Sequence, residues 1–299
     1  MDVLLFGTMG RVGEVVRDSL LSHGLGVSLV GFGQNVFRDE PGYRRELVKA
    51  VLEYHPDAVM PIGNAVAMSR WATMVRSGVP LRPSVCARGL EPGWEQTLRA
   101  VRYVVDTEAN VSMLDSKLSC FDLAGSLGVL QPGRYHSAAD VTDWDSVIFK
   151  RDVSFGGHGV HRPRSQEALA NLIAHQSPGE PYLMEQYVEG FDCSLDMVRG
   201  RGGAFCSAYR TVASQGCGPS QQREVMDRSL HCVESMRSTA EAMLGHLDYL
   251  GVCGFDFRVD ARGRAWLLEC NPRFTGGIDT QLASGFDIPW LLLCEASEL

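Results

Sequence analysis

The 299-residue chain lacks any apolar run approaching about 18 residues, which excludes a transmembrane helix. It also lacks a basic N-terminal segment followed by an apolar stretch, so we expect no signal peptide and a cytoplasmic location. Its net charge of −8 offers no basic face for nucleic acid, and we expect neither nucleic acid nor a membrane as a partner. With 45% hydrophobic and 21% charged residues, the composition remains that of an ordinary globular enzyme.

Nine cysteines occur in the chain, but no two of them form a CxxC pair. Structural zinc sites usually depend on such pairs, so a zinc site is not expected. The odd number and irregular spacing also fit reduced thiols better than a disulfide framework.

The first part of the chain alternates between strand and helix patterns. Residues 2–33 read as a strand, a glycine-rich turn, an amphipathic helix and a second strand, and a helix near 44–54 precedes a strand at 57–63. Such alternation predicts a parallel sheet with helices on both faces. We therefore expect residues 1–110 to form an N-terminal, Rossmann-like α/β domain, although segment 81–110 fits no clear pattern beyond one helix near 95–107.

The turn after the first strand has the spacing GxxGxxG, from Gly7 to Gly13. Dinucleotide-binding folds hold a pyrophosphate at this position, but with the stricter spacing GxGxxG. The second strand also ends without an acidic residue that could hold a ribose. A tight turn that needs small residues is therefore preferred to a dinucleotide site.

The remainder of the chain has an α+β pattern in which neighbouring strands follow one another directly. The segments 192–199 and 204–212 both read as strands. Because the short run RGRGG joins them, we expect an antiparallel hairpin. The other predicted elements are helices at 116–128, 165–175 and 222–248, and strands at 147–150 and 182–188.

The last predicted hairpin, residues 252–277, concentrates polar side chains in apolar surroundings. Side chains two residues apart on a strand share a face, and Glu269, Asn271 and Arg273 have that spacing. With Asp256, they offer oxygen ligands that suit Mg²⁺ and a guanidinium that suits phosphate. A solvated sheet face is the simpler alternative, but it does not explain an Asn-Pro-Arg run directly after a carboxylate.

The hairpin connection constrains this site. Asp256 and Glu269 share a face only if the loop has an even number of residues, in which case Asp256 pairs with Leu267 and Glu269 lies diagonal to it. Diagonal Cα atoms lie roughly 7–8 Å apart, and two carboxylates can converge on one cation across that gap. A three-residue loop would place the two carboxylates on opposite faces.

Two further segments have the composition of a nucleotide site. Lys150 and Ser154 precede the loop Phe155–Gly159, whose flexible backbone N–H groups could fold over phosphate oxygens. The strand that contains Glu185 runs into an acidic hinge that ends at Asp192, where backbone groups could pair with a purine edge and a carboxylate could hold ribose hydroxyls. Each segment alone is also compatible with a plain surface loop.

Taken together, these pieces resemble the ATP-grasp superfamily, in particular the carboxylate–amine ligase branch near carbamoyl phosphate synthetase and biotin carboxylase. The shared order is two lysines, a glycine-rich loop, an acidic hinge and a Glu-x-Asn-Pro-Arg terminus, here Glu269–Arg273. The resemblance covers essentially the whole chain and is strongest over 112–285. It implies a two-lobed ATP-grasp domain with antiparallel sheets, in which 111–190 is the central lobe with the glycine-rich lid and 191–299 is the C-terminal lobe with the magnesium and phosphate site.

The resemblance also implies a role for each matching residue. The lysines would contact the α- and β-phosphates, the glycine-rich lid the β- and γ-phosphates, and the hinge the adenine and ribose. Contacts to ATP are thereby assigned to Lys117, Lys150, Ser154, Gly156, Gly157, Gly159, Glu185, Gln186, Tyr187, Val188 and Asp192. Two Mg²⁺ ions, for which Mn²⁺ can substitute, would be held by Asp256, Glu269 and Asn271. Catalytic roles are implied for Arg273, Lys150 and, more loosely, Arg210.

The resemblance implies an ATP-dependent ligase that activates a small-molecule carboxylate, such as that of an amino acid, as an acyl-phosphate and joins it to an amine of the same or a second molecule. Thr275-Gly276-Gly277 resembles the loop where members of the family seat a substrate carboxylate. A homodimer is the habit of the family. A kinase that phosphorylates without ligation would have the same nucleotide site, and a nucleotide-sensing or NAD-binding protein that uses Gly7–Gly13 is an alternative of another class.

Overall fold

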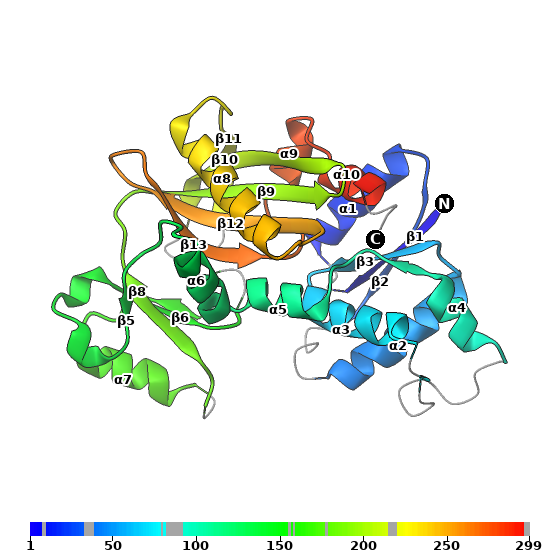
Figure 1. The fold of residues 1–299 in the computed structure, drawn as a ribbon, viewed down its shortest axis with the longest axis horizontal. Coiled ribbons are helices and arrows are strands. Elements are labelled where there is room, and N and C mark those ends of the chain that lie inside the picture. The colour runs from blue at the N-terminus through cyan, green and yellow to red at the C-terminus, as the bar shows by residue number, and fades with distance from the viewer. Residues whose placement is uncertain are drawn as a thin grey trace.

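The computed structural model describes residues 1–7, 10–32, 39–78, 80–81, 92–154, 157, 159–176, 179–214 and 220–295. These residues form three sheets with helices packed around them (Figure 1). One sheet is parallel and two are antiparallel, so the predicted combination of an α/β part with an α+β part is confirmed. The predicted domain boundaries and the Rossmann-like character of the first domain stay predictions.

The parallel sheet has the strand order β2-β1-β3-β4, and its strands are β1 (Asp2–Gly7), β2 (Gly26–Gly31), β3 (Ala58–Ile62) and β4 (Arg102–Tyr103). The accompanying helices are α1 (Arg11–Ser22), α2 (Glu40–Tyr54), α3 (Ala65–Arg76) and α4 (Trp94–Ala100). The predicted helix over 95–107 is shorter than expected, because the chain turns extended at Val101 and enters β4. The run VRYVV is rich in β-branched and aromatic residues, which favour a strand.

Gly7 is required by close packing rather than by a ligand. Its φ angle is +144°, and a Cβ atom there would overlap the backbone carbonyl of Ile62 on the neighbouring strand β3. Only glycine allows such an approach of two backbones. Thr8 and Met9, in the middle of the glycine-rich turn, lie outside the described residues. The preference for a tight turn therefore has a structural reason at the first glycine.

The second sheet has the order β5-β8-β6-β7 and carries helix α7 (Gln166–Ala174). Its strands are β5 (Arg134–Tyr135), β6 (Val147–Arg151), β7 (Val160–His161) and β8 (Tyr182–Gln186), and the short 3₁₀ turns Ala138–Asp140 and Trp144–Ser146 precede β6. Helices α5 (Glu108–Asp115) and α6 (Lys117–Ser126) connect this sheet to the parallel one (Figure 1).

The third sheet has the order β11-β10-β9-β12-β13. Its strands are β9 (Phe191–Gly200), β10 (Gly203–Ser214), β11 (Ser220–Val225), β12 (Gly251–Val259) and β13 (Ala265–Asn271), and its helices are α8 (His231–His246), α9 (Ile278–Ala283) and α10 (Ile288–Glu295). The predicted β9–β10 hairpin is confirmed. The predicted helix over 222–248 is wrong in its first part, since β11 pairs with β10 and the helix begins only at His231.

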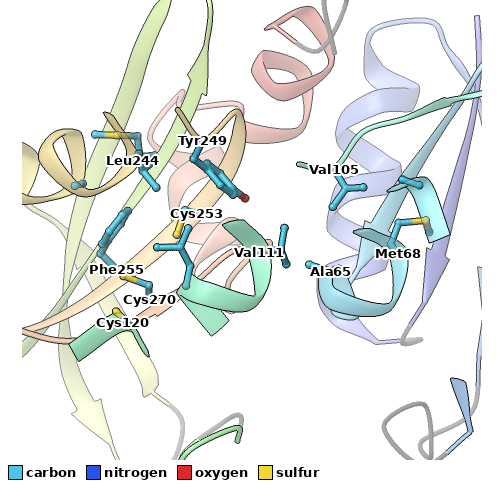
Figure 2. Close-up of a cluster of buried hydrophobic side chains, with 14 of the residues drawn as sticks. Ala65, Met68, Val105, Val111, Cys120, Leu244, Tyr249, Cys253, Phe255 and Cys270 are labelled. Carbon is cyan, nitrogen blue, oxygen red and sulfur yellow. The ribbon is translucent and has the colours of Figure 1, made fainter. Parts of the chain in front are cut away.

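The third sheet has one apolar face and one polar face. Along β9, Leu195 and Met197 point into the core beneath α8, whereas Ser194 and Asp196 alternate with them. This two-residue period is what a strand with two different faces requires. Figure 2 shows the core under the apolar face, where Val111 of α5 lies between side chains of the parallel unit on one side and, on the other, Cys253 of β12 and Tyr249, which precedes that strand. The core is thus continuous from one unit to the other.

Two sequence expectations concern thiols and membranes. The cysteines within the described ranges are all free thiols, and most of them are buried. Cys86 and Cys217 lie outside those ranges. Among the helices that the structure describes, none combines the length and the apolar character that crossing a bilayer demands.

A pair of glycine substitutions tests the packing between the hinge and the third sheet. Gly190 and Gly203 have nearly the same backbone conformation, with φ of +153° and +152°, but a Cβ at Gly190 would overlap the carbonyl of Val259 whereas a Cβ at Gly203 meets nothing. Both alanine variants carry the conformational strain of about 1–3 kcal/mol. We expect Gly190→Ala to lower the free energy of unfolding by about 2 kcal/mol more than Gly203→Ala, because it adds a steric clash. Equal losses in urea-induced unfolding would contradict this account.

Candidate active site

The site begins with an irregularity in the β12–β13 hairpin. Near the turn Phe257 pairs with Leu267, but one step further Asp256 pairs with Glu269, so Leu268 is an extra residue that forms a β-bulge. The loop Asp260–Arg264 has an odd number of residues, and the predicted pairing of Asp256 with Leu267 is wrong. The bulge corrects the parity and places the two carboxylates directly opposite each other on one face.

Two side-chain hydrogen bonds hold the Asp256 carboxylate. Its Oδ1 accepts a hydrogen bond from the Ser194 hydroxyl at 2.6 Å, and its Oδ2 accepts one from the amide of Asn271 at 3.1 Å. Burial and the facing carboxylate of Glu269 raise the pKa of Asp256 to about 7, although the Ser194 hydroxyl acts in the opposite direction. Two carboxylates this close repel each other, and a bound cation between them would relieve that repulsion.

Two buried lysines approach the hairpin from other elements. The Nζ of Lys117, at the start of α6, lies 3.2 Å from Glu269 Oε2. The Nζ of Lys150, on β6, lies 2.5 Å from Glu185 Oε1 and donates to the carbonyl of the bulged Leu268 at 3.3 Å. Burial acts to raise the pKa of Glu269, but both ammonium groups outweigh it and the pKa is lowered.

Helix α6 is fixed where it presents Lys117. The Ser116 side chain caps the helix by accepting from Ser119 N at 3.1 Å, and the Asp152 carboxylate accepts from both Ser116 Oγ and Leu118 N. A side-chain acceptor at this position satisfies N–H groups that the first turn leaves without partners. Because Asp152 directly follows β6, the same contact ties the positions of the two lysines together.

Arg273 and Asn271 are also in contact with each other. The guanidinium donates to Asn271 Oδ1 at 2.5 Å, while the amide of Asn271 donates to Asp256. Asp256, Glu269, Asn271 and Arg273 therefore form one connected group, as the sequence spacing predicted. Their roles as metal ligands and as the phosphoryl-stabilising residue stay predictions.

The glycine-rich segment follows β6 immediately. Among the predicted lid residues, Gly157 and Gly159 have φ of +76° and +85°, which non-glycine residues rarely adopt. Gly159 O accepts from Arg151 N at 3.0 Å, which fixes the end of the segment to β6. Ser154 lies at its start, and Gly156 is outside the described residues.

The hinge after β8 contains the residues predicted to bind adenine. Glu185 Oε2 is buried and has no hydrogen-bond partner within the described ranges, although Oε1 pairs with Lys150. The N–H of Gln186 already donates to Gly133 O at 2.7 Å, so of its backbone groups only the carbonyl suits a base, and Val188 follows two residues later. Glu185 thus offers an acceptor that suits an exocyclic amine.

Two further hinge residues, Tyr187 and Asp192, contact arginine side chains. Tyr187 N donates to Ser146 O at 2.8 Å, and its ring lies against two arginines. Asp192, at the start of β9, is half-exposed and forms an ion pair with Arg258 at 2.9 Å.

The suggestion that Arg210 contacts the γ-phosphate is not supported by its position. Arg210 pairs in register with Cys193 on β9, whereas the Asp256 face of that strand carries Ser194, so the two side chains point to opposite sides of the sheet. The Arg210 guanidinium forms an exposed ion pair with Glu224 and lines a cavity of about 660 Å³ on the α8 side. The physical reason is parity, since neighbouring residues on a strand face opposite ways.

The donor set fits a hard divalent cation. Among the described residues no group of three or more histidine, cysteine, aspartate or glutamate side chains has the arrangement of a protein-only metal site. Two carboxylates and one amide oxygen, from Asp256, Glu269 and Asn271, are fewer ligands than a closed site needs. Mg²⁺ commonly binds in this way, through one or two carboxylates together with water and the phosphates of a substrate.

Residues 179–298 match the family model described as "ATP-grasp in the biosynthetic pathway with Ter operon". This match covers the C-terminal part of the chain, which is similar to that ATP-grasp family. No curated protein matches the sequence.

Solved structures share the ATP-grasp fold over nearly the whole chain. The biotin carboxylase domain dimer of Hydrogenobacter thermophilus 2-oxoglutarate carboxylase, in complex with MgADP, ADP and bicarbonate, matches with a TM-score of 0.75 and 14% identity over 99% of this chain and 70% of that one. L-amino acid ligase from Bacillus licheniformis matches with a TM-score of 0.68 and 16% identity over 100% and 74%. N5-carboxyaminoimidazole ribonucleotide synthetase from Thermotoga maritima matches with a TM-score of 0.60 and 15% identity over 98% and 76%.

Beyond the shared ATP-grasp elements, a buried polar network that the sequence did not reveal lies beside Arg273. Asp196 on β9 accepts from the Thr275 hydroxyl at 2.9 and 3.1 Å and from the Gln281 amide at 3.3 Å, and the same amide donates to Ser207 O at 3.0 Å. A Cβ at Gly277 would overlap the Tyr209 ring. The loop Thr275–Gly277 is therefore held close to the polar face.

A chain of charges extends from this loop to the parallel unit. Asp279, at the start of α9, lies 3.8 Å from the Arg223 guanidinium of β11 and 2.5 Å from that of Arg11, at the start of α1. Arg223 Nε is buried without a partner within the described ranges, and its guanidinium carbon lies 5.8 Å from the Tyr209 ring centroid. Arg223 therefore lies on the polar face, whereas Arg210 lies on the opposite one.

A sequence signal for part of this network existed. Asp192, Ser194 and Asp196 are polar at every second position of an otherwise apolar strand, which indicates a polar face. Arg223 had no such signal, because the segment that contains it also fits the amphipathic pattern of a helix.

The buried Asp196 carboxylate makes stability depend on pH. Burial raises its pKa to about 6, although the Thr275 and Gln281 hydrogen bonds and the Arg223 and Arg273 charges lower it. Since the folded-state pKa lies above that of an unfolded aspartate, about 3.9, this group stabilises the fold at low pH and loses that contribution as the pH rises through 6. The stability of Asp196→Asn relative to wild type should therefore rise by about 2 kcal/mol between pH 4.5 and 7.5. A difference independent of pH in urea unfolding would refute the assignment.

Proposed function

We propose that this protein is an ATP-dependent ligase that activates a small-molecule carboxylate as an acyl-phosphate, joins it to an amine, and releases ADP and phosphate. The observation that carries the proposal is the shared polar face, on which Asp256, Glu269, Asn271 and Arg273 meet two buried lysines. Phosphoryl transfer needs little covalent help from a protein and depends on positioned charges of this kind.

The carboxylates fit the metal side of a nucleotide complex. Asp256, Glu269 and Asn271 would hold Mg²⁺, with two ions as the expected number and Mn²⁺ as a possible substitute. Bound magnesium neutralises charge on the phosphate oxygens. For Asn271 Oδ1 to serve as a ligand, the Arg273 guanidinium that now occupies it must be released. The same movement would free Arg273 for the transferring phosphoryl group.

The cationic and hinge residues would hold the rest of ATP. Lys117 and Lys150 would contact the phosphates, and Ser154, Gly157 and Gly159 would supply donors from the lid, together with Gly156. Glu185, with its unpartnered Oε2, suits the exocyclic amine of adenine. Gln186, Tyr187 and Val188 would complete the base site, and Asp192 would accept from the ribose.

The substrate end lies beyond Arg273. There Arg223 Nε is buried without a partner in the described ranges, and the Thr275–Gly277 loop is fixed by Asp196. A guanidinium provides a planar fork of donors that matches a carboxylate. Arg223 and this loop would therefore receive the carboxylate substrate, and Arg11 of the parallel unit lies nearby through its ion pair with Asp279.

The reaction divides into two balanced steps. A carboxylate oxygen attacks the γ-phosphorus, the bond to the β-phosphate oxygen breaks, and ADP leaves. The amine nitrogen then attacks the acyl carbon, phosphate leaves, and the nitrogen gives up a proton. Arg273 would stabilise the negative charge in both steps, and closure of the 154–160 segment would exclude water from the acyl-phosphate.

An ADP-release screen of amino-acid pairs with MgATP tests the proposal. Amino acids are the first choice because one structural neighbour is an L-amino acid ligase. Release that requires both a carboxylate and an amine supports a ligase, whereas a phosphorylated product that is stable without any amine identifies a kinase. A homodimer, the state of the matched carboxylase domain, stays a prediction to be tested by light scattering.

Arginine variants on the two faces of the sheet test the catalytic assignment. We expect Arg273→Ala to lower turnover roughly 100- to 1,000-fold, as loss of one transition-state donor typically does. Arg210→Ala should change turnover less than about threefold, because its exposed ion pair with Glu224 lies on the opposite face. Steady-state ADP release measures both. Normal turnover in Arg273→Ala, or a large loss of turnover in Arg210→Ala, would contradict the assignment.

A separate prediction concerns substrate binding. Arg223→Ala should raise the KM for the carboxylate substrate about tenfold or more, since a charge-assisted hydrogen bond is lost, while the Kd of MgADP stays within about twofold of wild type. Arg228→Ala, an exposed arginine in the turn after β11, is the matched control. If MgADP affinity falls as much as substrate affinity does, Arg223 belongs to the nucleotide site instead.

A further inference from the structure

The hinge residue Tyr187 is clamped between two arginines from different parts of the molecule. The guanidinium carbon of Arg162, just after β7, lies 3.8 Å from the Tyr187 ring centroid, and that of Arg258, on β12, lies 4.7 Å from it. Each guanidinium is attracted to the ring by a cation–π interaction. Tyr187 is therefore in contact with both the β5-β8-β6-β7 sheet and the third sheet.

Arg258 distributes its donors over three acceptors around the hinge. One terminal nitrogen donates to Asp192 Oδ1 at 2.9 Å, and the other donates to Tyr187 OH at 2.7 Å and to Gly190 O at 3.1 Å. Its Nε is buried and has no partner among the described residues. Arg258 is the buried member of its ion pair, since its side chain is 19% exposed and that of Asp192 is 46% exposed. These contacts hold Arg258 in place, and Arg258 in turn holds the Asp192 carboxylate.

The position of this pair along the sheet matches the sugar of a bound nucleotide. Asp192 and Arg258 are direct partners in the β9–β12 ladder, and two residues further along the same face Ser194 pairs with Asp256. Two residues of a strand span about 7 Å. A nucleotide whose phosphates lie at Asp256 and Glu269, and whose base lies at the hinge, must pass its ribose over Asp192 and Arg258.

We propose that Arg258 is a positioning residue that fixes the Asp192 carboxylate for the ribose hydroxyls and thereby makes the site selective for ribonucleotides over 2′-deoxyribonucleotides. The inference rests on the proposed function, because it assumes that a nucleotide occupies this face. The ion pair uses Oδ1 of Asp192, which leaves Oδ2 to accept from the ribose. Without Arg258, the half-exposed Asp192 carboxylate would sample several rotamers. Binding would then have to restrict it to one rotamer, and the entropy lost would weaken its contact with the ribose.

A lysine could not replace this arginine. A planar guanidinium offers five donors in a fixed arrangement, whereas an ammonium is a single point charge on a flexible stem. A guanidinium can reach Asp192, Tyr187 and Gly190 at once while its central carbon lies over the Tyr187 ring. Arg258→Lys therefore keeps the charge and removes the geometry, which makes it a second variant beside Arg258→Ala.

The experiment measures equilibrium binding of MgADP and Mg-2′-deoxyADP by isothermal titration calorimetry, which needs no knowledge of the substrate. We expect the wild-type protein to bind MgADP about tenfold or more tightly than the deoxynucleotide, since one hydrogen bond to a charged group is lost. Asp192→Asn, Arg258→Ala and Arg258→Lys should each reduce this ratio to about twofold or less. Arg258→Ala combined with Asp192→Asn should reduce it no further, because both residues act through one contact.

Arg264→Ala is the matched control. Arg264 lies on the same hairpin, forms an ion pair with Asp260 at 2.7 Å and stacks on Trp266 at 5.0 Å, but it belongs to the exposed turn. This variant should keep the wild-type ratio. A ratio that survives Arg258→Lys and Arg258→Ala but is lost in Asp192→Asn would overturn the positioning role. If the wild-type protein binds MgADP and Mg-2′-deoxyADP equally well, this inference is wrong but the proposed nucleotide site stands. If it does not bind MgADP at all, both the inference and the proposed function are wrong.

Discussion

The structure of the site depends on one extra residue in a hairpin. Without the bulge at Leu268, continuing the register of the turn would pair Asp256 with Leu268 and direct Glu269 into the apolar core under α8. With the bulge, Glu269 faces Asp256, and Cys270 takes the buried position opposite Phe255. The bulged residue also presents its carbonyl to Lys150. One irregularity thus provides both the carboxylate pair and an anchor for a lysine, which is a common use of bulges beside active sites.

Placing two carboxylates face to face in a buried setting is unfavourable unless cations compensate for them. The protein supplies that compensation from outside the hairpin, through Lys117 on α6 and Lys150 on β6. Burial acts to lower the pKa of Lys150, but the carboxylates of Glu185 and Glu269 outweigh burial and raise it. The charges therefore hold three elements together, and the same lysines are the groups that phosphates would contact. In the proposed function, stability and nucleotide binding would depend on one set of interactions.

The parts of the site that could be predicted from sequence are those that a short-range pattern encodes. The spacing of Glu269, Asn271 and Arg273 fixes a shared face whatever the strand pairs with. The register with the partner strand could not be predicted, because a bulge cannot be recognised from composition and loop parity alone gives the wrong pairing. Arg210 was misplaced because an isolated strand does not reveal which of its two faces meets the site. Arg223 was missed because pairing with β10 overrides a helical pattern.

Across the polar face of the third sheet, the chemistry changes from one edge to the other. Asp256 and Glu269 lie on β12 and the edge strand β13, Arg258 and Asp192 lie on the central strands β12 and β9 at the hinge, and Arg223 lies at the opposite end, on the edge strand β11 beside the Thr275–Gly277 loop. The strands β9 and β12 are paired on both sides, and the outer edge of β13 is held by the contacts of Leu267 N with Leu130 O and of Lys150 with Leu268 O, whereas the β11 end uses an edge strand, a loop and an arginine of the parallel unit. An edge strand and a loop can change without disturbing the ladder, because few backbone hydrogen bonds depend on them. A family that keeps one nucleotide chemistry while varying its substrates would be expected to vary at this end, and Arg223 with its neighbours is where the substrate of this chain should be sought.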